Sequence, residues 1–521
     1  MAGAMQTLLH ALIQFPQEIP DIARSTSEAL KVWLALAGIG LLLVWTVLRP
    51  TVRRWILVAL VLVASLTYVR FGGRLLFQNT DNYDLFHYYL NSKYFDELGY
   101  YDLYPAGILV DHENKGPFLP EGDKYLAQDE SGHHWRPIEH ALERGRVVKE
   151  KFTPERWEAF THDALVLQRE KGQFDGGLWK QMIQDHGFNG TPAWVAEARP
   201  LASIVPVEHK KLLCLIDVGL LALGVLAIGW AYGVDAALWT TFFLCITYST
   251  RWPTISWAYL RYDYVMSLLV ALALIRKGRH FLAGIFAGHA AALRFFPAMY
   301  MFGPAAKGLF ELLGGRLNKK LLALGLAFVL GAGAFVALGT WTVGPLNVRE
   351  HFENMMDHNS AEQLSSRRIG FALALPFRGD LEPKNITKAI KAETDEQKPL
   401  RFGISFLVLA GFAWGLRNKR DDETFAYGWI PFFLLTTASY YYYVVRVVLI
   451  AFHAGEIDRL RNRIGLGILL ALEAMTNFNE VHFAGHRVFL VGCLAWGCFL
   501  YALVMLVLLV LDRGETAKAR A

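Results

Sequence analysis

Charged residues are scarce in this chain, and the shortage is confined to particular segments. Asp, Glu, Lys and Arg make up 19% of the 521 residues, whereas soluble domains usually carry about 25%. The shortage falls in apolar runs of roughly 17–25 residues, the length that crosses a bilayer as a helix. A soluble enzyme and a disordered chain are therefore excluded. The net charge of +5 is too small and too dispersed for nucleic-acid binding.

Cysteine is also rare, and its four positions lie inside apolar runs at 214, 245, 493 and 498. The long polar segments contain none, so we expect no stabilising disulfides and interpret the thiols as small buried hydrophobes. The cysteines do not have the spacing of a zinc site. The N-terminal segment 1–29 lacks a basic stretch ahead of an apolar core, which favours a short interfacial helix over a cleaved signal peptide.

The apolar runs predict an all-α polytopic membrane protein with about thirteen transmembrane helices. Clusters of Lys and Arg lie between these runs, and such clusters collect on the cytoplasmic side of membrane proteins. With the N-terminus outside, all six clusters fall on that side. The expected spans are 30–48, 55–71, 211–231, 234–250, 255–275, 281–293, 296–314, 320–341, 402–416, 425–439, 440–456, 464–478 and 488–511.

The same alternation places two long polar loops outside, and we expect both to contain short amphipathic helices. Acidic residues outnumber basic ones in the first loop. This layout predicts a bacterial inner-membrane protein whose active site faces the periplasm or exterior. The segments are the N-terminal segment 1–29, two helices in 30–71, the first loop 72–210, a bundle in 211–341, the second loop 342–401, a C-terminal bundle in 402–511 and a cytoplasmic tail, 512–521.

An acidic motif, DNYDLFHYYL, opens the first external loop at residues 81–90. Helical spacing places Asp81, Asp84 and Tyr88 on one face, and His87 lies close to the Asp84 side. One carboxylate could take a proton from an attacking hydroxyl while the other orients the acceptor or holds a cation. The alternative is a solvated helix start with acidic residues near its positive end.

Arginines also lie at the ends of the apolar runs. Arg261 and Asp263 lie near the external end of the fifth span, Arg294 lies at the break between the sixth and seventh, and Arg446 follows four tyrosines. Arginine inside a membrane is costly and usually faces a cavity, and its guanidinium matches phosphate oxygens. We therefore expect a phosphate pocket. The alternatives are snorkelling to the interface and pairing, for instance of Arg261 with Asp263.

The second external loop has polar residues that suit it to cap a cavity. His351, His358, Arg367 and Arg368 all lie in it. We include His358 with His87, Tyr88, Asp263 and the arginines above as candidate substrate-binding residues.

This layout resembles the GT-C superfamily of integral-membrane glycosyltransferases, and most closely its bacterial polyprenyl-phosphate-mannose-dependent mannosyltransferases. The resemblance rests on the acidic residues that open the first loop, on LRYD at 260–263, and on the stretch from LAGI at 282–285 to LRFFP at 293–297. It covers roughly residues 55–510. The chain departs from the family pattern in its extra first span and in having Arg294 where the family often has Lys.

The resemblance implies an inverting sugar transfer on the external face of the membrane. The donor is a polyprenyl-phosphate sugar, and the acceptor is a lipid or glycan that meets it among membrane lipids. Asp81 or Asp84 acts as the base, and Arg261 and Arg294 stabilise the departing lipid phosphate. Some members of the superfamily use a divalent metal and many use none, and nothing in this sequence requires a cofactor.

Two other functions fit parts of the pattern. A transporter or flippase of a lipid-linked or anionic substrate could use the same arginines, but no internal repeat of the kind common in transporters is visible. An external acyl- or phosphoethanolamine-type transferase needs a nucleophile or a tight metal site, and the sequence shows neither.

Overall fold

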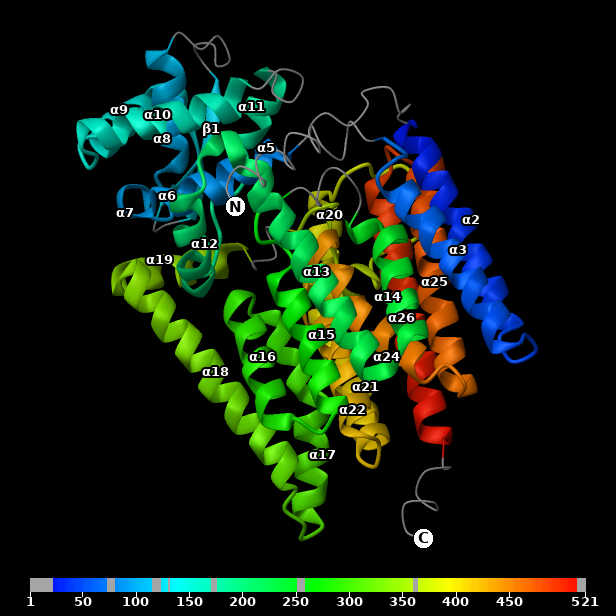
Figure 1. The fold of residues 1–521 in the computed structure, drawn as a ribbon. Coiled ribbons are helices and arrows are strands. Elements are labelled where there is room, and N and C mark those ends of the chain that lie inside the picture. Colours follow the sequence, from blue (N-terminus) through cyan, green and yellow to red (C-terminus); the bar gives the residue numbers. More distant parts are fainter. Residues whose placement is uncertain are drawn as a thin grey trace, which may run out of the picture.

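The computed structural model describes residues 22–72, 80–114, 123–129, 132–169, 176–250, 258–358 and 364–512. These residues are mainly helical and form a bundle with an extramembrane domain, residues 80–204, at one end (Figure 1). Most of the expected interfacial segment 1–29 lies outside the described residues, as do residues 513–521 of the expected tail. The helical bundle confirms the α-helical class and indicates a membrane-associated protein.

Six helical segments in the described part of the chain are long and apolar enough to cross a membrane. Their outward side chains include exposed tryptophans such as Trp33 and Trp55, 70% and 69% exposed, which suits a surface in contact with lipid. The six are α2 (Arg24–Leu43), α3 (Pro50–Tyr68), α13 (Lys210–Tyr232) with the preceding turn η2 (Val207–His209), α18 (Lys319–Val343), α21 (Lys398–Leu416) and α26 (Arg487–Leu511).

The other seven expected spans coincide with helices that are shorter, broken or more strongly charged. The number thirteen therefore stays a prediction, whereas six helices meet the criteria of length and composition. These segments comprise α14 (Val234–Ile246), η3 (Tyr248–Thr250), α15 (Asp263–Arg276), α16 (His280–Leu293), η4 (Phe296–Met301), α17 (Phe302–Leu313), α22 (Asp421–Ala426), α23 (Trp429–Leu435), η7 (Tyr440–Arg446), α24 (Val447–Gly455) and α25 (Leu460–His482).

Helices α16 and α23 both end beside a large cavity at the junction of the bundle and the extramembrane domain. Residues 291–296, at the end of α16, and residues 436–442, after α23, contribute to its wall. Non-helical backbone at membrane depth is tolerated where it is buried in protein or lines a cavity, because its polar groups then find partners. The breaks after α16 and α23 are thus explained by the cavity that they line.

Helix α16 packs closely against α18 through two glycines on one face. A Cβ atom on Gly284 would lie 2.4 Å from the Leu324 carbonyl oxygen, and one on Gly288 would lie 2.5 Å from that of Phe328. Small residues four apart allow membrane helices to approach at backbone distance. This contact fixes the end of α16, and therefore Arg294, relative to α18.

The extramembrane domain consists of short helices that pack around α8. Gly145 of α9 lies so close to α8 that a Cβ atom there would come within 2.5 Å of the Pro105 carbonyl oxygen. The helices are α5 (Asn82–Leu85), the π-helix η1 (Phe86–Leu90), α6 (Asn91–Lys93), α7 (Phe95–Leu98), α8 (Leu103–Glu113), α9 (Ile138–Lys149), α10 (Pro154–Arg169), α11 (Gly176–Met182) and α12 (Pro192–Ile204).

The first loop contains a pair of strands in addition to the expected helices. Strands β1 (Lys124–Asp129) and β2 (Gly132–Pro137) form an antiparallel hairpin in which Leu126 pairs with Trp135. Tyr125 is fully buried while Trp135 is 57% exposed, so the hairpin buries apolar side chains without a helical repeat. Gly132 has a φ of +111°, which glycine adopts without steric cost at a chain reversal.

The second loop lies at the same end of the bundle as the extramembrane domain. Its helix α19 (Pro345–His358) follows α18 and runs beside α12 (Figure 1). Strand β3 (Arg368–Ile369) then pairs with β4 (Ala438–Ser439), which ties the loop to the backbone break after α23. A turn, η6 (Phe371–Leu373), and helix α20 (Lys388–Glu396) lead to α21.

Candidate active site

The cavity has a volume of about 1140 Å³ and brings together most of the site residues expected from the sequence. Its walls come from the acidic motif, the segment 184–193, the breaks after α16 and α23, helices α18 and α19, and the start of β3. The expected residues that line it are Asp81, Asp84, His87, Tyr88, Arg261 and Arg294; His351, Arg367 and Arg368 join them from the second loop.

The two carboxylates of the acidic motif have different surroundings. Asp81 caps the N-terminus of α5, and its side chain accepts a hydrogen bond from the Asp84 backbone N–H over 3.2 Å. Asp84 is 2% exposed, forms an ion pair with Arg261 and accepts a hydrogen bond from the Tyr259 backbone N–H over 3.0 Å. Asp84 is therefore committed to protein partners, whereas Asp81 forms no ion pair with a described residue.

Burial raises the pKa of Asp81 to about 7, although the nearby positive charge of Arg261 opposes the rise. A carboxylate in a poorly solvated site is less stable in its charged form, which explains the direction. A group that titrates near neutral pH can both accept and release a proton under working conditions. These properties suit Asp81 to the role of a general base.

Arg261 is held by its backbone as well as by Asp84. The backbone N–H groups of Arg261 and Tyr262 both donate to the Asp217 carboxylate, at 2.9–3.0 Å. The preceding residue, Leu260, has a φ of +47°, an uncommon conformation for a non-glycine residue. Asp217 on α13 thus fixes a sharp turn that presents the Arg261 side chain to the cavity.

Aromatic rings surround the guanidinium groups on the cavity wall. The Arg261 guanidinium lies 5.5 Å from the ring centroid of Tyr88 and 5.0 Å from that of Tyr441. Arg294 lies 5.9 Å from the ring centroid of Tyr264. Such cation–π contacts hold a cation while leaving its N–H donors available to a ligand.

Arg294 directly follows the last turn of α16. Its backbone is extended there, and its side chain donates to the Leu293 carbonyl oxygen over 2.8 Å. The buried Nε atom of Arg294 has no hydrogen-bond partner, and no carboxylate among the described residues pairs with this side chain. Its positive charge is therefore available to an anion in the cavity.

His87 and Tyr88 connect the acidic motif to neighbouring loops. His87 donates from Nδ1 to the Tyr83 carbonyl oxygen over 2.7 Å, and its Nε2 accepts from the Tyr104 hydroxyl over 2.6 Å. Burial lowers the pKa of His87, so the ring is neutral near pH 7. The Tyr88 hydroxyl donates to Asn189 over 2.6 Å. Both residues line the cavity, and these contacts position the segment that carries Asp81.

The acidic motif is also linked to Asp185, which lies between α11 and α12. The Tyr83 hydroxyl donates to the Asp185 carboxylate over 2.6 Å. Burial raises the pKa of this carboxyl, but His87 and the hydrogen bond from Tyr83 outweigh it, so the net shift is downward. Asp185 is therefore an anion at neutral pH and resembles Asp84 rather than Asp81.

The structure does not bring two expected site residues, Asp263 and Arg446, to the cavity wall. Asp263 begins α15 and accepts from the Tyr264 backbone N–H over 2.7 Å; Arg261 pairs with Asp84 instead of with it. Arg446 is fully buried and forms a 2.7 Å ion pair with Glu473, so its charge is neutralised within the bundle. The His358 side chain lies outside the described part of the structure.

Sequence reasoning missed Asp217 and the tyrosines at 441 and 442 as site residues. Asp217 gave a signal, because an acidic residue within a long apolar run usually has a specific partner. The tyrosines were visible only as neighbours of Arg446. The place of Tyr441 beside Arg261 depends on the backbone break at η7, which has no clear mark in the sequence.

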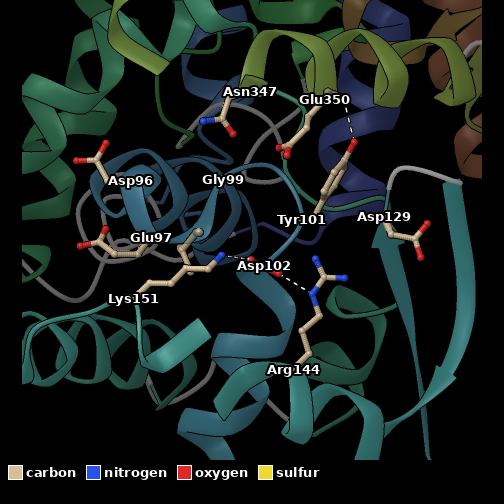
Figure 2. A pocket seen from close by; sticks show the side chains of 11 residues that line it. Asp96, Glu97, Gly99, Tyr101, Asp102, Asp129, Arg144, Lys151, Asn347 and Glu350 are labelled. Atoms are coloured by element: carbon tan, nitrogen blue, oxygen red, sulfur yellow. Dashed lines mark hydrogen bonds and ion pairs between the residues drawn. The ribbon is translucent and has the colours of Figure 1, made fainter. Parts of the chain in front are cut away.

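A second, smaller pocket lies between the extramembrane domain and α19 (Figure 2). Its volume is about 600 Å³, and Asp96, Asp129 and Glu350 are among its lining residues. At its base Asp102 pairs with Arg144 at 2.6 Å and with Lys151 at 2.8 Å. Because these central charges satisfy one another, we interpret them as a structural contact and assign the pocket no chemistry.

Comparisons of the chain with protein-family models, curated proteins and solved structures find no match. The described residues contain no group of three or more His, Cys, Asp or Glu side chains arranged to hold a metal ion, so no residue is assigned to the divalent metal that the resemblance allows. Any statement about function therefore depends on the geometry of the cavity.

Proposed function

We propose that this protein is an inverting glycosyltransferase that moves a sugar from a polyprenyl-phosphate donor to a lipid or glycan acceptor. The observation that supports this proposal is the convergence of Asp81, Arg261 and Arg294 on one cavity at the edge of the bundle. The reaction needs a base for the acceptor hydroxyl and fixed positive charge for a phosphate leaving group. Both are available in the same space.

In the proposed step, the acceptor hydroxyl oxygen attacks the anomeric carbon of the donor sugar. Asp81 takes the hydroxyl proton as the new carbon–oxygen bond forms. The bond between the anomeric carbon and the phosphate oxygen breaks, and its electron pair leaves with the lipid phosphate. Attack from the face opposite the leaving group inverts the configuration at the anomeric carbon.

Asp81 is the better candidate for the base because Asp84 is already engaged. The ion pair with Arg261 and the hydrogen bond from Tyr259 stabilise Asp84 as a carboxylate. Removing a proton from the acceptor would require Asp84 to give up these interactions. We assign Asp84 the positioning of Arg261, and thereby of the turn that contains it.

Arg294 is the main candidate for holding the lipid phosphate. Next to it the cavity wall becomes apolar, with Phe295, Val336 and Phe352 exposed by 52%, 48% and 56%. These residues belong to the end of α16, to α18 and to α19. A polyprenyl chain that lies against them would place its phosphate at Arg294 and its sugar towards Asp81.

The test is transfer of a labelled sugar from polyprenyl-phosphate donors to a crude acceptor lipid fraction by the purified full-length protein in nanodiscs. We expect Asp81→Asn to lower transfer by about two to four orders of magnitude, the usual contribution of a general base. Asp380→Asn, an exposed acidic residue of the second loop, is the matched control and should retain full transfer.

Two results would count against the proposal. Transfer that is unchanged in Asp81→Asn would remove the base assignment. Lipid movement across the bilayer without a new glycosidic bond would instead support the transporter or flippase alternative, which the same arginines permit.

A further inference from the structure

Positive charge reaches the cavity from the second loop as well as from the bundle. Four arginines line it, at positions 261, 294, 367 and 368. Arg261 is paired with Asp84, and Arg294 lies beside the apolar wall proposed for the lipid chain. This leaves Arg367 and Arg368, which enter the cavity from the second loop.

Arg367 lies on the side of the cavity that contains the acidic motif. Burial and Asp185 raise the pKa of the Tyr83 hydroxyl, and the positive charge of Arg367 acts in the opposite direction on the same group. Tyr83 and Asp81 belong to the same short segment and line the cavity together. Arg367 forms no ion pair with a described carboxylate, and its side chain is exposed.

Arg368 occupies a wall formed by tyrosines. Burial lowers its pKa, and Tyr441 and Tyr442 partly offset this effect. Its guanidinium adds positive charge to this part of the cavity wall. The β3–β4 pairing of Arg368 with Ser439 fixes its backbone, and the Tyr440 backbone N–H donates to the Arg367 carbonyl oxygen over 2.9 Å. Both arginines are thus anchored at the wall.

We infer that the acceptor is itself anionic and that Arg367 and Arg368 bind its phosphate or carboxylate group while Arg294 binds the donor phosphate. This inference rests on the proposed function, because it assigns the two arginine groups to the two substrates of one reaction. Guanidinium groups match either kind of anion through paired N–H donors. Separate cation groups would also reduce the repulsion between two anions in one cavity.

The inference is tested by calorimetric binding to the full-length protein in detergent, with farnesyl phosphate as the donor-side probe. Glycerol 3-phosphate and glucuronate are the acceptor-side probes, and glycerol is the neutral control. We expect at least one acceptor-side anion to bind to protein that is already saturated with farnesyl phosphate, and glycerol not to bind. The probe that binds more tightly, glycerol 3-phosphate or glucuronate, identifies the anionic group as phosphate or carboxylate.

Variants then assign the two sites. The double variant Arg367→Gln/Arg368→Gln should weaken binding of the acceptor-side anion by about tenfold or more, equivalent to about 1.4 kcal/mol. Its affinity for farnesyl phosphate should be unchanged. Arg294→Gln should weaken binding of farnesyl phosphate and leave binding of the acceptor-side anion unchanged. Arg378→Gln, which removes a surface ion pair to Glu393 on the same loop, should change neither. If the double variant does not fold, Arg367→Gln alone is used. It should also weaken binding of the acceptor-side anion.

The inference would be overturned if farnesyl phosphate and the acceptor-side anion displaced each other. It would also be overturned if only Arg294→Gln lost binding of the acceptor-side anion. Neither result would affect the proposed sugar transfer. Failure of the wild-type protein to bind farnesyl phosphate would instead count against the proposed function. Binding of the acceptor-side anions would still test whether Arg367 and Arg368 form an anion site. Failure of both acceptor-side anions to bind would also overturn the inference.

Discussion

Asp84 and Arg261 form a buried ion pair in which the side chains are 1% and 16% exposed. The pair joins the acidic motif of the extramembrane domain to the turn that precedes α15. It also gives the two carboxylates of the motif different roles, because Asp84 is held in the ion pair whereas Asp81 titrates near pH 7. The cavity therefore has one carboxylate with a structural role and one with the properties of a base.

The first prediction concerns the dependence of transfer on pH. Asp81 acts as a base only when ionised, and its pKa is about 7. The rate of transfer should therefore rise with pH up to about 7 and level off above it. A profile of kcat/KM for the wild-type protein from pH 5 to 9 measures this. An activity that is flat below pH 6 would contradict the assignment of Asp81.

The second prediction is that Asp84→Asn shifts this profile to lower pH. The substitution removes a negative charge near Asp81 and frees Arg261, whose positive charge already lowers the pKa of Asp81. Both effects favour the ionised form of Asp81. Comparison of the two pH profiles tests the shift, and a shift to higher pH would show that Asp84 does not act through Arg261.

A third prediction concerns stability, because the pKa of Asp81 is higher in the folded protein than its ordinary value of 3.8. The folded state then binds a proton more tightly than the unfolded state, so ionisation of Asp81 destabilises the fold as pH rises from about 4 to 7. We expect Asp81→Asn to have a higher Tm than wild type at pH 8 and a much smaller difference at pH 4.5. Thermal unfolding at the two pH values measures the difference.

The fourth prediction is that Arg446 and Glu473 act on stability rather than on substrate binding. Removing one partner of a buried ion pair typically costs about 3–5 kcal/mol, because the other charge is left unpaired. Arg446→Met should therefore lower the Tm strongly, and the double variant Arg446→Met/Glu473→Leu should recover much of the loss. A normal Tm combined with weaker binding of farnesyl phosphate would return Arg446 to the phosphate site.

The fifth prediction tests the contact between α16 and α18. A leucine at Gly288 would collide with the backbone of α18, and overpacking of this kind typically costs about 1–3 kcal/mol. We expect Gly288→Leu to lower the Tm and to weaken binding of farnesyl phosphate, because Arg294 lies at the end of the same helix. Gly325→Leu, on α18 with open space around its Cβ position, is the matched control.

Much of the fold could be predicted from the sequence because membrane helices leave long apolar runs. The break at Arg294 and the helix start at Asp81 also have local signals, in the proline at 297 and in the spacing of the acidic residues. The partner of Arg261 could not be predicted: Asp263 is close in sequence, but Asp84 is the partner because the chain folds back over α13. The hairpin β1–β2 was missed because its strands are short and not regularly alternating.

The role of Arg446 shows a second limit of sequence reasoning. An arginine after four tyrosines at the end of an apolar run indicates a charge inside the membrane, but not the direction in which its side chain points. The residue that decides this is Glu473 on α25, which has no fixed spacing from it. Pairing across helices depends on how they pack, and a local pattern does not record it.

The short ladder between β3 and β4 affects how the two substrates would exchange. It fastens the polar side of the cavity to the bundle through the Arg368–Ser439 and Ile369–Ala438 pairs, whereas the apolar side is formed by exposed side chains of α16, α18 and α19. A spent lipid carrier could therefore slide out sideways and be replaced while the ladder stays intact. The arginines of the second loop would keep their places throughout such an exchange.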